Sequence, residues 1–462
     1  DQCYIVSARQ AAMGAKIVVV NHHLLLADLL LKEEGFGELL PGADAVIIDE
    51  AHQFPEIAQG FFNVSFSSRS LVDLSRDLKT EAFSQIAFSK KLLPAAEKLN
   101  KLAQDVRLSL PNIGNNLLWS DIPKAFSKKL KSLILHLDFL IDQLQAVDES
   151  NLGLRSCYER ICVLAERIEQ IVSASDVDGL RWLGLTKRGF SLNFTPVDTS
   201  TELGSLLSNQ ICSWVFTSAT LAVGDDFSHY QSRLGLKEIN KLKIPSPFDY
   251  QDSGLLILPN DLPEPSEDIY TKRMLDKLLP LIMASKGRAF LLFTSYRALN
   301  QASKIIKKSK SWSFPLLVQG DSSRSKLLEQ FIALSNPILL GTASFWEGVD
   351  IRGDGLVVVC IDRLPFTSPG DPMLKARLDA IARDGGQPFI DFQLPQAILA
   401  LKQGVGRLIR DNKDYGVVVI CDPRLTSKSY GRKFLQSLPP FPISNNIYDA
   451  VDFFYNKGSM DA

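Results

Sequence analysis

Two adjacent carboxylates, Asp49 and Glu50, follow a short β-branched run and precede Ala51 and His52. Acids at the end of a buried strand are costly unless a positive group meets them. Mg²⁺ prefers hard oxygen ligands, so Asp49 is a candidate magnesium ligand. Glu50 can then polarise a water molecule that attacks a γ-phosphate, and His52 can link this site to a neighbouring element. An acid pair that caps the following helix is the alternative, and the tetrapeptide alone does not decide.

A glutamine and two arginines form a second candidate site within residues 403–410. Pro395 can open a helix that runs through this segment. Gln403, Arg407 and Arg410 would then share one face, at i, i+4 and i+7. Paired guanidinium groups suit a polyphosphate, because each offers a fixed fork of donors. Gly404 and Gly406 would each cost about 1 kcal/mol inside a helix, which indicates a closely approaching ligand or domain rather than a solvated arginine face.

Two further polar segments directly follow strand-like runs. Residues 217–220 carry the hydroxyls of Ser218 and Thr220, which can relay hydrogen bonds between sites or simply cap a helix. Residues 341–350 form a glycine-bearing loop with two acids, Glu347 and Asp350. Such loops after strands are typical of ligand contact. Trp346 in the same loop can stack on a ligand or pack in the core.

Strands and helices must alternate to position these segments. Apolar runs predict buried parallel strands at 17–20, 45–48, 214–217, 289–293, 316–318, 338–340, 356–361 and 416–420. Ligands of open parallel sheets bind beyond the carboxyl ends of the strands, where the candidate residues lie. Between residues 62 and 197, apolar residues recur every three or four positions, which predicts packed amphipathic helices and one short strand-like piece near residues 190–194. A proline-rich stretch at 244–265 predicts a domain boundary.

The composition is that of an ordinary globular protein, with 462 residues of which 45% are hydrophobic and 22% charged. The net charge of −1 provides no whole-chain attraction for a polyanion, so local groups would have to hold one. No apolar run approaches the ~18 residues that cross a bilayer, so we expect no membrane partner. Six scattered cysteines do not form a disulfide scaffold and predict a cytoplasmic location.

Together and in this order, the four segments resemble the motifs of the XPD/DinG family of superfamily 2 iron–sulfur DNA helicases, and within it the bacterial YoaA/DinG-like branch. Residues 46–52 resemble motif II, 218–220 motif III, 291–296 motif IV, 341–350 motif V and 403–410 motif VI. Smaller family marks are Ser-Pro-Phe at 246–248, Arg-Leu-Pro-Phe at 363–366 and Asp-Pro-Arg at 422–424.

The resemblance implies an α/β fold with two RecA-like parallel-sheet domains, the first incomplete, and a mostly helical Arch-like insertion. The expected divisions are 1–61 for the end of the iron–sulfur region and part of the first RecA-like domain, 62–197 for the insertion, 198–245 for the rest of the first domain, and 246–462 for the second domain.

The resemblance also implies an ATP-dependent motor that moves 5′→3′ on single-stranded DNA and unwinds forked duplexes in repair or replication, with a replication or repair protein as a partner. Asp49 would hold Mg²⁺, Glu50 would be the catalytic base, and Arg407 and Arg410 would be arginine fingers. Gln403 would sense the nucleotide. The other residues expected around the nucleotide are His52, Ser218, Thr220, Glu347 and Asp350.

Contacts to DNA are expected at Thr294 and Ser295, because hydroxyls at a strand end that faces a helix start suit a phosphate. His22 is a candidate to line the DNA track, although a core or capping histidine is equally compatible with its position. The lysines at 304–310 favour a solvated helix face.

Two family features are missing from the chain. It contains no Gly-x-x-x-x-Gly-Lys-Ser/Thr phosphate loop. Cys3 resembles the last of four ligands of a [4Fe-4S] cluster, and the other three are expected upstream, since the remaining cysteines fit core positions. We therefore expect the natural N-terminus to precede Asp1, and this chain alone neither to hydrolyse ATP well nor to hold an intact cluster. A non-catalytic nucleic-acid-binding or scaffold protein derived from a helicase is the alternative.

Overall fold

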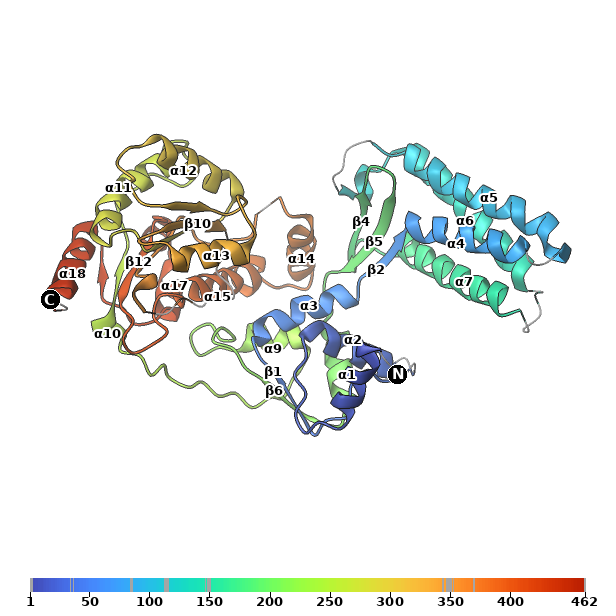
Figure 1. The fold of residues 1–462 in the computed structure, drawn as a ribbon, viewed down its shortest axis with the longest axis horizontal. Helices are drawn as coiled ribbons and strands as arrows, with labels where there is room; N and C mark the ends of the chain where they lie inside the picture. Colours follow the sequence, from blue (N-terminus) through green and yellow to red (C-terminus); the bar gives the residue numbers. More distant parts are fainter. Residues whose placement is uncertain are drawn as a thin grey trace.

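The computed structural model of the chain describes residues 3–33, 35, 37–83, 86–111, 116–145, 147, 151–342, 345, 351, 353–368 and 370–460. A parallel sheet with helices on both faces lies at one end of the molecule, and a bundle of long helices lies at the other (Figure 1). A smaller α/β unit near the N-terminus lies between them. No helix in the described part is both long and apolar enough to cross a membrane.

The second RecA-like domain is built on seven parallel strands in the order β13-β7-β12-β11-β8-β10-β9. Their bounds are β7 Gly254–Ile257, β8 Ala289–Phe293, β9 Leu316–Val318, β10 Ile338–Thr342, β11 Val358–Ile361, β12 Gly416–Ile420 and β13 Ile443–Ser444. The five strands predicted in this domain are confirmed. β7 was missed because it lies inside the proline-rich stretch, and β13 because it has only two residues.

Side chains alternate across this sheet, so that each face has its own apolar core. Phe290 and Leu292 of β8 belong to one cluster, whereas Leu291 and Phe293 belong to the other. The first face is covered by α13 (Arg324–Ala333), α15 (Leu394–Val405) and α17 (Gly431–Ser437), and the second by α11 (Tyr270–Ala284), α12 (Tyr296–Lys308) and α18 (Ile447–Met460). The second domain also contains α10 (Tyr250–Ser253), α14 (Pro372–Arg383) and α16 (Arg424–Ser427).

The first RecA-like domain carries two parallel strands, β1 (Ala45–Ile48) and β6 (Ser213–Phe216), paired in register from Ala45 with Ser213 to Ile48 with Phe216. Its helices are α1 (Tyr4–Met13), α2 (His22–Glu33), α3 (Phe54–Phe61), α8 (Ser200–Ser208) and α9 (Ser228–Leu234).

The strand predicted at residues 17–20 of this domain is wrong. These residues form no strand, and Ile17 and Val19 are 84% and 92% exposed. An apolar run becomes a strand only where a neighbouring backbone pairs with it, and the described chain offers these residues no such partner.

The Arch-like insertion combines a helical bundle with a small antiparallel sheet. The helices are α4 (Ser68–Phe83), α5 (Ile86–Leu108), α6 (Lys124–Gln145) and α7 (Leu152–Ser173). The sheet has the order β2-β5-β4-β3, with β2 Val64–Ser67, β3 Leu117–Leu118, β4 Gly179–Leu185 and β5 Phe190–Pro196. The predicted apolar stripes of α6 and α7 are buried, and the strand-like piece at 190–194 is β5. This sheet connects the bundle to the rest of the molecule (Figure 1). The domain boundaries themselves stay a prediction.

Candidate active site

The acid pair lies just beyond the carboxyl end of β1, with both side chains exposed. The loop that carries Asp49 and Glu50 is held by the segment after β6, since the backbone N–H of Ala51 donates to the carbonyl of Thr217 over 3.0 Å. Glu50 adopts a left-handed backbone conformation, with φ 46° and ψ 43°. For a residue with a Cβ this costs about 1–2 kcal/mol, and such strain is often held at functional sites. The fixed loop turns the Glu50 carboxylate toward Ser218.

A chain of hydrogen bonds connects Glu50 to the second domain. The Ser218 hydroxyl donates to Glu50 Oε2 over 3.2 Å and lies 3.4 Å from the Thr220 hydroxyl. Gln403 Nε2, on α15 of the second domain, donates to Thr220 Oγ1 over 3.1 Å. An amide nitrogen only donates, so the proton of Thr220 is available to Ser218 and that of Ser218 to Glu50. Every donor in this relay therefore points toward the carboxylate of Glu50.

His52 lies beside the same relay, on the short turn 51–53. Its Nδ1 is 3.0 Å from Ser218 Oγ and 3.3 Å from Glu50 Oε2. Because the Ser218 hydroxyl donates to Glu50, Nδ1 must carry the proton that points at this pair. Imidazole and hydroxyl thus supply two donors to one carboxylate oxygen.

His22 contacts the backbone of the acid pair. Its Nε2 donates to the carbonyl of Asp49 over 2.9 Å, and its ring packs edge-on against Phe54. His22 therefore stabilises the backbone of the loop that carries Asp49.

A cavity of about 350 Å³ opens between the two RecA-like domains next to the relay. Its walls include His52 and Thr220 from the first domain and Thr294 and Gln403 from the second. The same cavity is therefore lined by residues expected to contact the nucleotide and by one residue, Thr294, expected to contact DNA. The polar residues of this wall that were missed from the sequence include Glu56, His229, Arg233 and Gln396.

Three of these residues contact each other, and one of the contacts crosses the domain boundary. Glu56 Oε1 is 3.5 Å from Arg233 Nη1 and accepts from Gln396 Nε2 over 3.4 Å. Burial and the nearby Arg233 lower the pKa of His229 to about 4, so this histidine is neutral at pH 7. No local sequence pattern indicates this cluster, because its members come from α3, α9 and α15.

The predicted helix face shared by Gln403, Arg407 and Arg410 is wrong. α15 ends at Val405, Gly406 follows as its C-cap, and both arginines lie beyond it. The Asp414 carboxylate accepts from the backbone N–H groups of Arg410 and Asp411, at 2.8 and 2.9 Å, and draws the chain out of the helix. Both arginines are half-buried and engaged in contacts.

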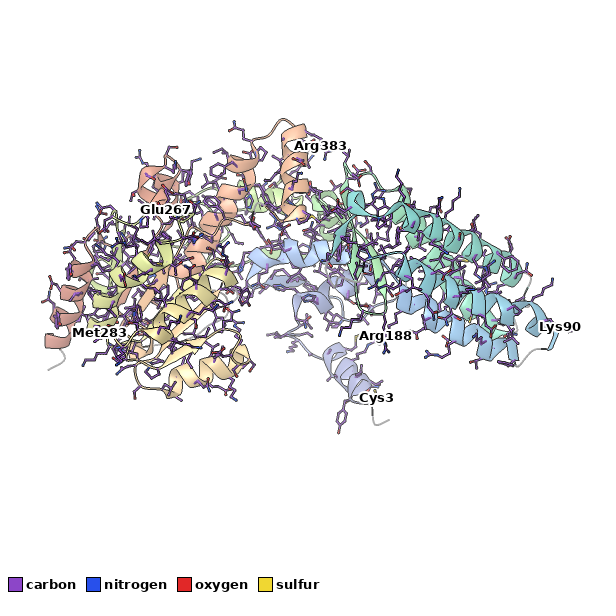
Figure 2. All side chains as sticks on the ribbon, turned by 90° about the horizontal axis from the view of Figure 1, so that it is seen from above. Cys3, Lys90, Arg188, Glu267, Met283 and Arg383 are labelled. Atoms are coloured by element: carbon purple, nitrogen blue, oxygen red, sulfur yellow. The ribbon has the colours of Figure 1, made fainter. Side chains whose placement is uncertain are left out.

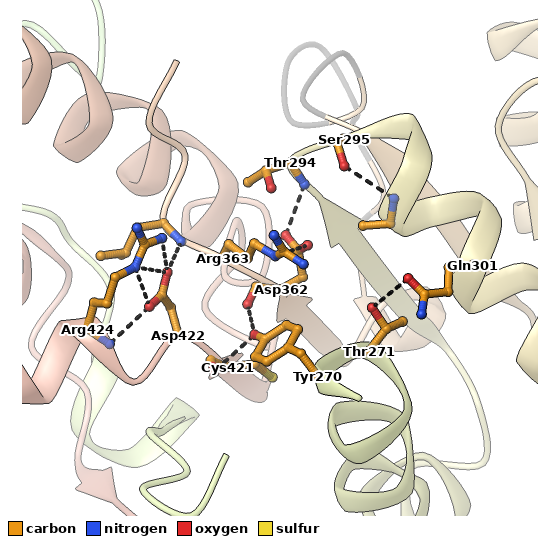
Figure 3. A network of polar contacts seen from close by, with 12 residues as sticks. Tyr270, Thr271, Thr294, Ser295, Gln301, Asp362, Arg363, Cys421, Asp422 and Arg424 are labelled. Carbon is orange, nitrogen blue, oxygen red and sulfur yellow. Dashed lines mark hydrogen bonds and ion pairs between the residues drawn. The ribbon is translucent and has the colours of Figure 1, made fainter. Parts of the chain in front are cut away.

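Thr294 and Ser295 follow β8, but parts of both are already used within the domain (Figure 3). The backbone N–H of Thr294 donates to Asp362 Oδ1 over 2.9 Å. The Ser295 hydroxyl accepts from the N–H of Ala298 over 3.2 Å and so caps α12. The Thr294 side chain, which lines the cavity, remains the better placed of the two for a ligand.

Two buried aspartates organise this edge of the second sheet (Figure 3). Asp362 follows β11, and burial raises its pKa to about 7 against the opposing effect of Arg363. The Tyr270 hydroxyl donates to the carbonyl oxygens of Asp362 and, over 3.1 Å, of Cys421. Asp422 follows β12 and is held by Arg424, whose Nη2 is 2.6 Å from its Oδ2. Acids at two adjacent strand ends thus fix the loops that border the cavity.

Comparison with known proteins identifies the family. A family profile described as "Helicase C-terminal domain" matches residues 278–441. The ATP-dependent DNA helicase YoaA of Escherichia coli is 42% identical over 98% of this chain and 71% of its own length. The chain belongs to the YoaA/DinG family of helicases. The ATP-dependent DNA helicase DinG of Photobacterium profundum is 29% identical over 95% of this chain and 70% of its own length. The solved structure of S. tokodaii Xpd4 has a similar fold, with a TM-score of 0.54, 15% identity and coverage of 92% of this chain and 81% of that one.

The remaining residues expected from the family are Glu347, Asp350 and Cys3. Glu347 and Asp350 lie outside the described residues. Cys3 is exposed at the start of α1, where the backbone N–H groups of Val6 and Ile5 lower the pKa of its thiol. Among the described residues no group of three or more His, Cys, Asp or Glu side chains is arranged to hold a metal ion. The described part therefore does not supply a ligand set for a [4Fe-4S] cluster.

Proposed function

We propose that this chain forms the motor of an ATP-dependent DNA helicase, in which closure of the two RecA-like domains drives hydrolysis. The relay from Gln403 through Thr220 and Ser218 to Glu50 carries the proposal. It joins the expected catalytic base to the opposite domain, which is what a motor needs if domain position is to control chemistry. Membership of the YoaA/DinG family supports the same activity.

In this proposal the substrate is ATP with Mg²⁺, bound in the cleft between the domains. Asp49 would hold Mg²⁺, since it is an exposed carboxylate at a strand end. Glu50 would accept the proton of the attacking water, and the donors at Ser218 and His52 would orient its carboxylate. Arg407 and Arg410 would stabilise charge on the transferred phosphate. Gln403 would sense the nucleotide and couple it to the position of the second domain.

The other residues expected at the nucleotide are Thr220 in the relay, and Glu347 and Asp350 in the motif V loop. The DNA proposal rests on Thr294, Ser295 and His22, of which Thr294 faces the cavity. We propose that the helicase translocates 5′→3′ on single-stranded DNA and opens forked duplexes in the cytoplasm, in repair or replication and together with a repair or replication protein.

We also propose that Cys3 is one thiolate ligand of a [4Fe-4S] cluster whose other ligands this chain does not supply. The lowered pKa of Cys3 favours the thiolate that such a cluster requires. The 462-residue chain alone is then expected to hold no cluster and to hydrolyse ATP poorly. A second candidate function, a non-catalytic DNA-binding scaffold, is favoured by one observation, the lack of a phosphate-loop sequence in the chain.

The experiment compares ATP hydrolysis by the 462-residue chain and by the protein made from its complete reading frame, each with single-stranded DNA, with RNA and without nucleic acid. The helicase proposal expects DNA-stimulated hydrolysis by the complete protein, loss of turnover in Glu50→Gln and retention of DNA binding in that variant. DNA binding without any ATP hydrolysis by the complete protein would favour the scaffold instead. Robust hydrolysis by the 462-residue chain would contradict the expected inactivity.

A further inference from the structure

A half-buried arginine of the second domain, Arg377, reaches out of that domain. It lies on α14, and its Nε and Nη2 both donate to the carbonyl of Val197, over 3.1 and 3.0 Å. Nη2 also donates to Gln59 Oε1 over 2.9 Å. Val197 ends the Arch-like insertion, and Gln59 lies on α3 of the first domain. One guanidinium therefore joins all three parts of the molecule.

Gln59 completes this junction from the other side. Its Nε2 donates to the carbonyl of Pro196 over 2.7 Å, while its Oε1 accepts from Arg377. The carbonyls of Pro196 and Val197 are consecutive and stand at the point where β5 leaves the insertion. Both are thus held by side chains from outside the insertion. The end of β5 cannot move relative to the second domain without breaking the bonds that Arg377 donates to Val197.

A second arginine of α14 makes a separate contact to the same insertion. Arg383 Nη2 donates to the carbonyl of Val177 over 2.7 Å, in the turn that precedes β4. α14 accordingly stands between the seven-stranded sheet and strands β4 and β5 in Figure 1, and Figure 2 shows Arg383 at this boundary. Arg377 and Arg383 hold the two adjacent strands that support the helical bundle.

On its own domain, Arg377 rests on the ring of Phe392, whose centroid is 5.0 Å from the guanidinium carbon. Phe392 also contacts His229 of the first domain, with 5.9 Å between the ring centroids. Burial and the charge of Arg233 lower the pKa of Arg377 to about 10, and the guanidinium still remains charged at pH 7. Burying a charged guanidinium is costly unless its donors are hydrogen-bonded. The bonds to Val197 and Gln59 therefore fix the position of the Arg377 side chain.

We propose that Arg377 is the positioning residue through which the second RecA-like domain sets the orientation of the Arch-like insertion. When the second domain moves on the first, α14 moves with it and displaces the ends of β4 and β5. The inference rests on the proposed helicase function, because it assigns to that motor the route from domain movement to the insertion. It requires that loss of Arg377 separates ATP hydrolysis from duplex unwinding, since the relay at Glu50 does not include it.

The test measures both activities and the geometry in the protein made from its complete reading frame. Arg377→Ala removes the three hydrogen bonds that Arg377 donates and leaves the bond from Gln59 to Pro196 in place. Arg377→Lys keeps the charge but loses the fork of donors. Arg273→Ala, an exposed arginine on α11, is the matched control. A donor and an acceptor fluorophore, attached through unnatural amino acids at the exposed positions Ser132 and Lys308, report the distance between the insertion and the second domain.

We expect Arg377→Ala to keep DNA-stimulated ATP hydrolysis within about twofold of wild type and to lower the unwinding rate about tenfold. The energy-transfer distribution of Arg377→Ala should be broader than that of wild type. The width for Arg377→Lys should lie between these two, and the width for Arg273→Ala should equal that of wild type. The proposal is overturned if the distribution does not change, or if unwinding and hydrolysis fall in proportion. If the wild-type protein showed no ATPase activity, the proposed helicase function would be wrong. The role of Arg377 would still be tested, because the fluorescence comparison measures the position of the insertion without catalysis.

Discussion

The amide of Gln403 donates to the hydroxyl of Thr220 across the boundary between the two RecA-like domains, with 3.1 Å between Nε2 and Oγ1. Thr220 is buried, and its other neighbour is the Ser218 hydroxyl, which donates to Glu50. The supply of donors to the Glu50 carboxylate therefore depends on the position of α15. This dependence gives domain closure a direct effect on the orientation of the expected base.

Replacing Gln403 by Leu should lower the turnover number for ATP by about fivefold to tenfold, which corresponds to the loss of about one buried hydrogen bond. The Michaelis constant should change less, because the hydrogen bond that is lost orients the base. Gln396→Leu is the control, since Gln396 lies on the same helix and also contacts the first domain, through Glu56. Steady-state ATPase kinetics decide, and an equal loss in both variants would contradict a relay specific to Gln403.

A pair of substitutions at Thr220 separates its hydroxyl from its volume. Thr220→Val has nearly the same shape but leaves the Gln403 amide and the Ser218 hydroxyl without this partner. Thr220→Ser keeps the hydroxyl and loses only a methyl group. We expect Thr220→Val to reduce DNA-stimulated ATP turnover about tenfold and Thr220→Ser to stay within about threefold of wild type. If Thr220→Ser were as impaired as Thr220→Val, packing and not hydrogen bonding would explain the position.

The sequence predicts five of the seven strands of the second sheet, because their apolar runs are continuous and each is followed by a recognisable polar segment. It predicts the residue types of the relay for the same reason, since Ser218 and Thr220 directly follow β6. It does not predict where α15 ends, because Asp414 holds the backbone of Arg410 from beyond the helix. Nor does it predict the Arg377 junction, whose partners are 180 and 318 positions away in the chain.

Asp362 should make the stability of the second domain depend on pH. Burial raises its pKa to about 7, above the ordinary value of 3.8, so the folded state binds a proton more tightly than the unfolded state does. Its contribution to the free energy of unfolding is therefore retained at low pH and is lost as pH rises from about 4 to about 7. The loss should be on the order of 4 kcal/mol.

Asp362→Asn tests this dependence, because an amide oxygen can still accept from the Thr294 N–H. Urea unfolding of wild type and variant at pH 5 and pH 8 should show the variant gaining stability relative to wild type at the higher pH. A constant difference between the two proteins at both pH values would show that Asp362 does not titrate in this range.

Two glycines with positive φ allow steric and conformational costs to be separated in the first domain. Gly235 ends α9 at φ 70°, and a Cβ added there would lie 1.8 Å from the carbonyl oxygen of Ser200. Gly224, at φ 63°, has no atom within 4 Å of an added Cβ. Gly224→Ala should therefore cost about 1–2 kcal/mol for its backbone conformation alone, and Gly235→Ala clearly more.

The effect of Gly235→Ala should extend to the acid loop. α9 carries Tyr230, whose hydroxyl donates to the carbonyl of Ala51 over 2.8 Å, directly after Glu50. The carbonyl of Ser200 belongs to α8, so the clash forces α8 and α9 apart and shifts this anchor. We expect Gly235→Ala to lower both the thermal unfolding temperature and ATP turnover of the complete protein, and Gly224→Ala to lower the unfolding temperature slightly with turnover near wild type. Equal unfolding temperatures in the two variants would disprove the clash, whereas unchanged turnover in Gly235→Ala would show that α9 does not position the loop.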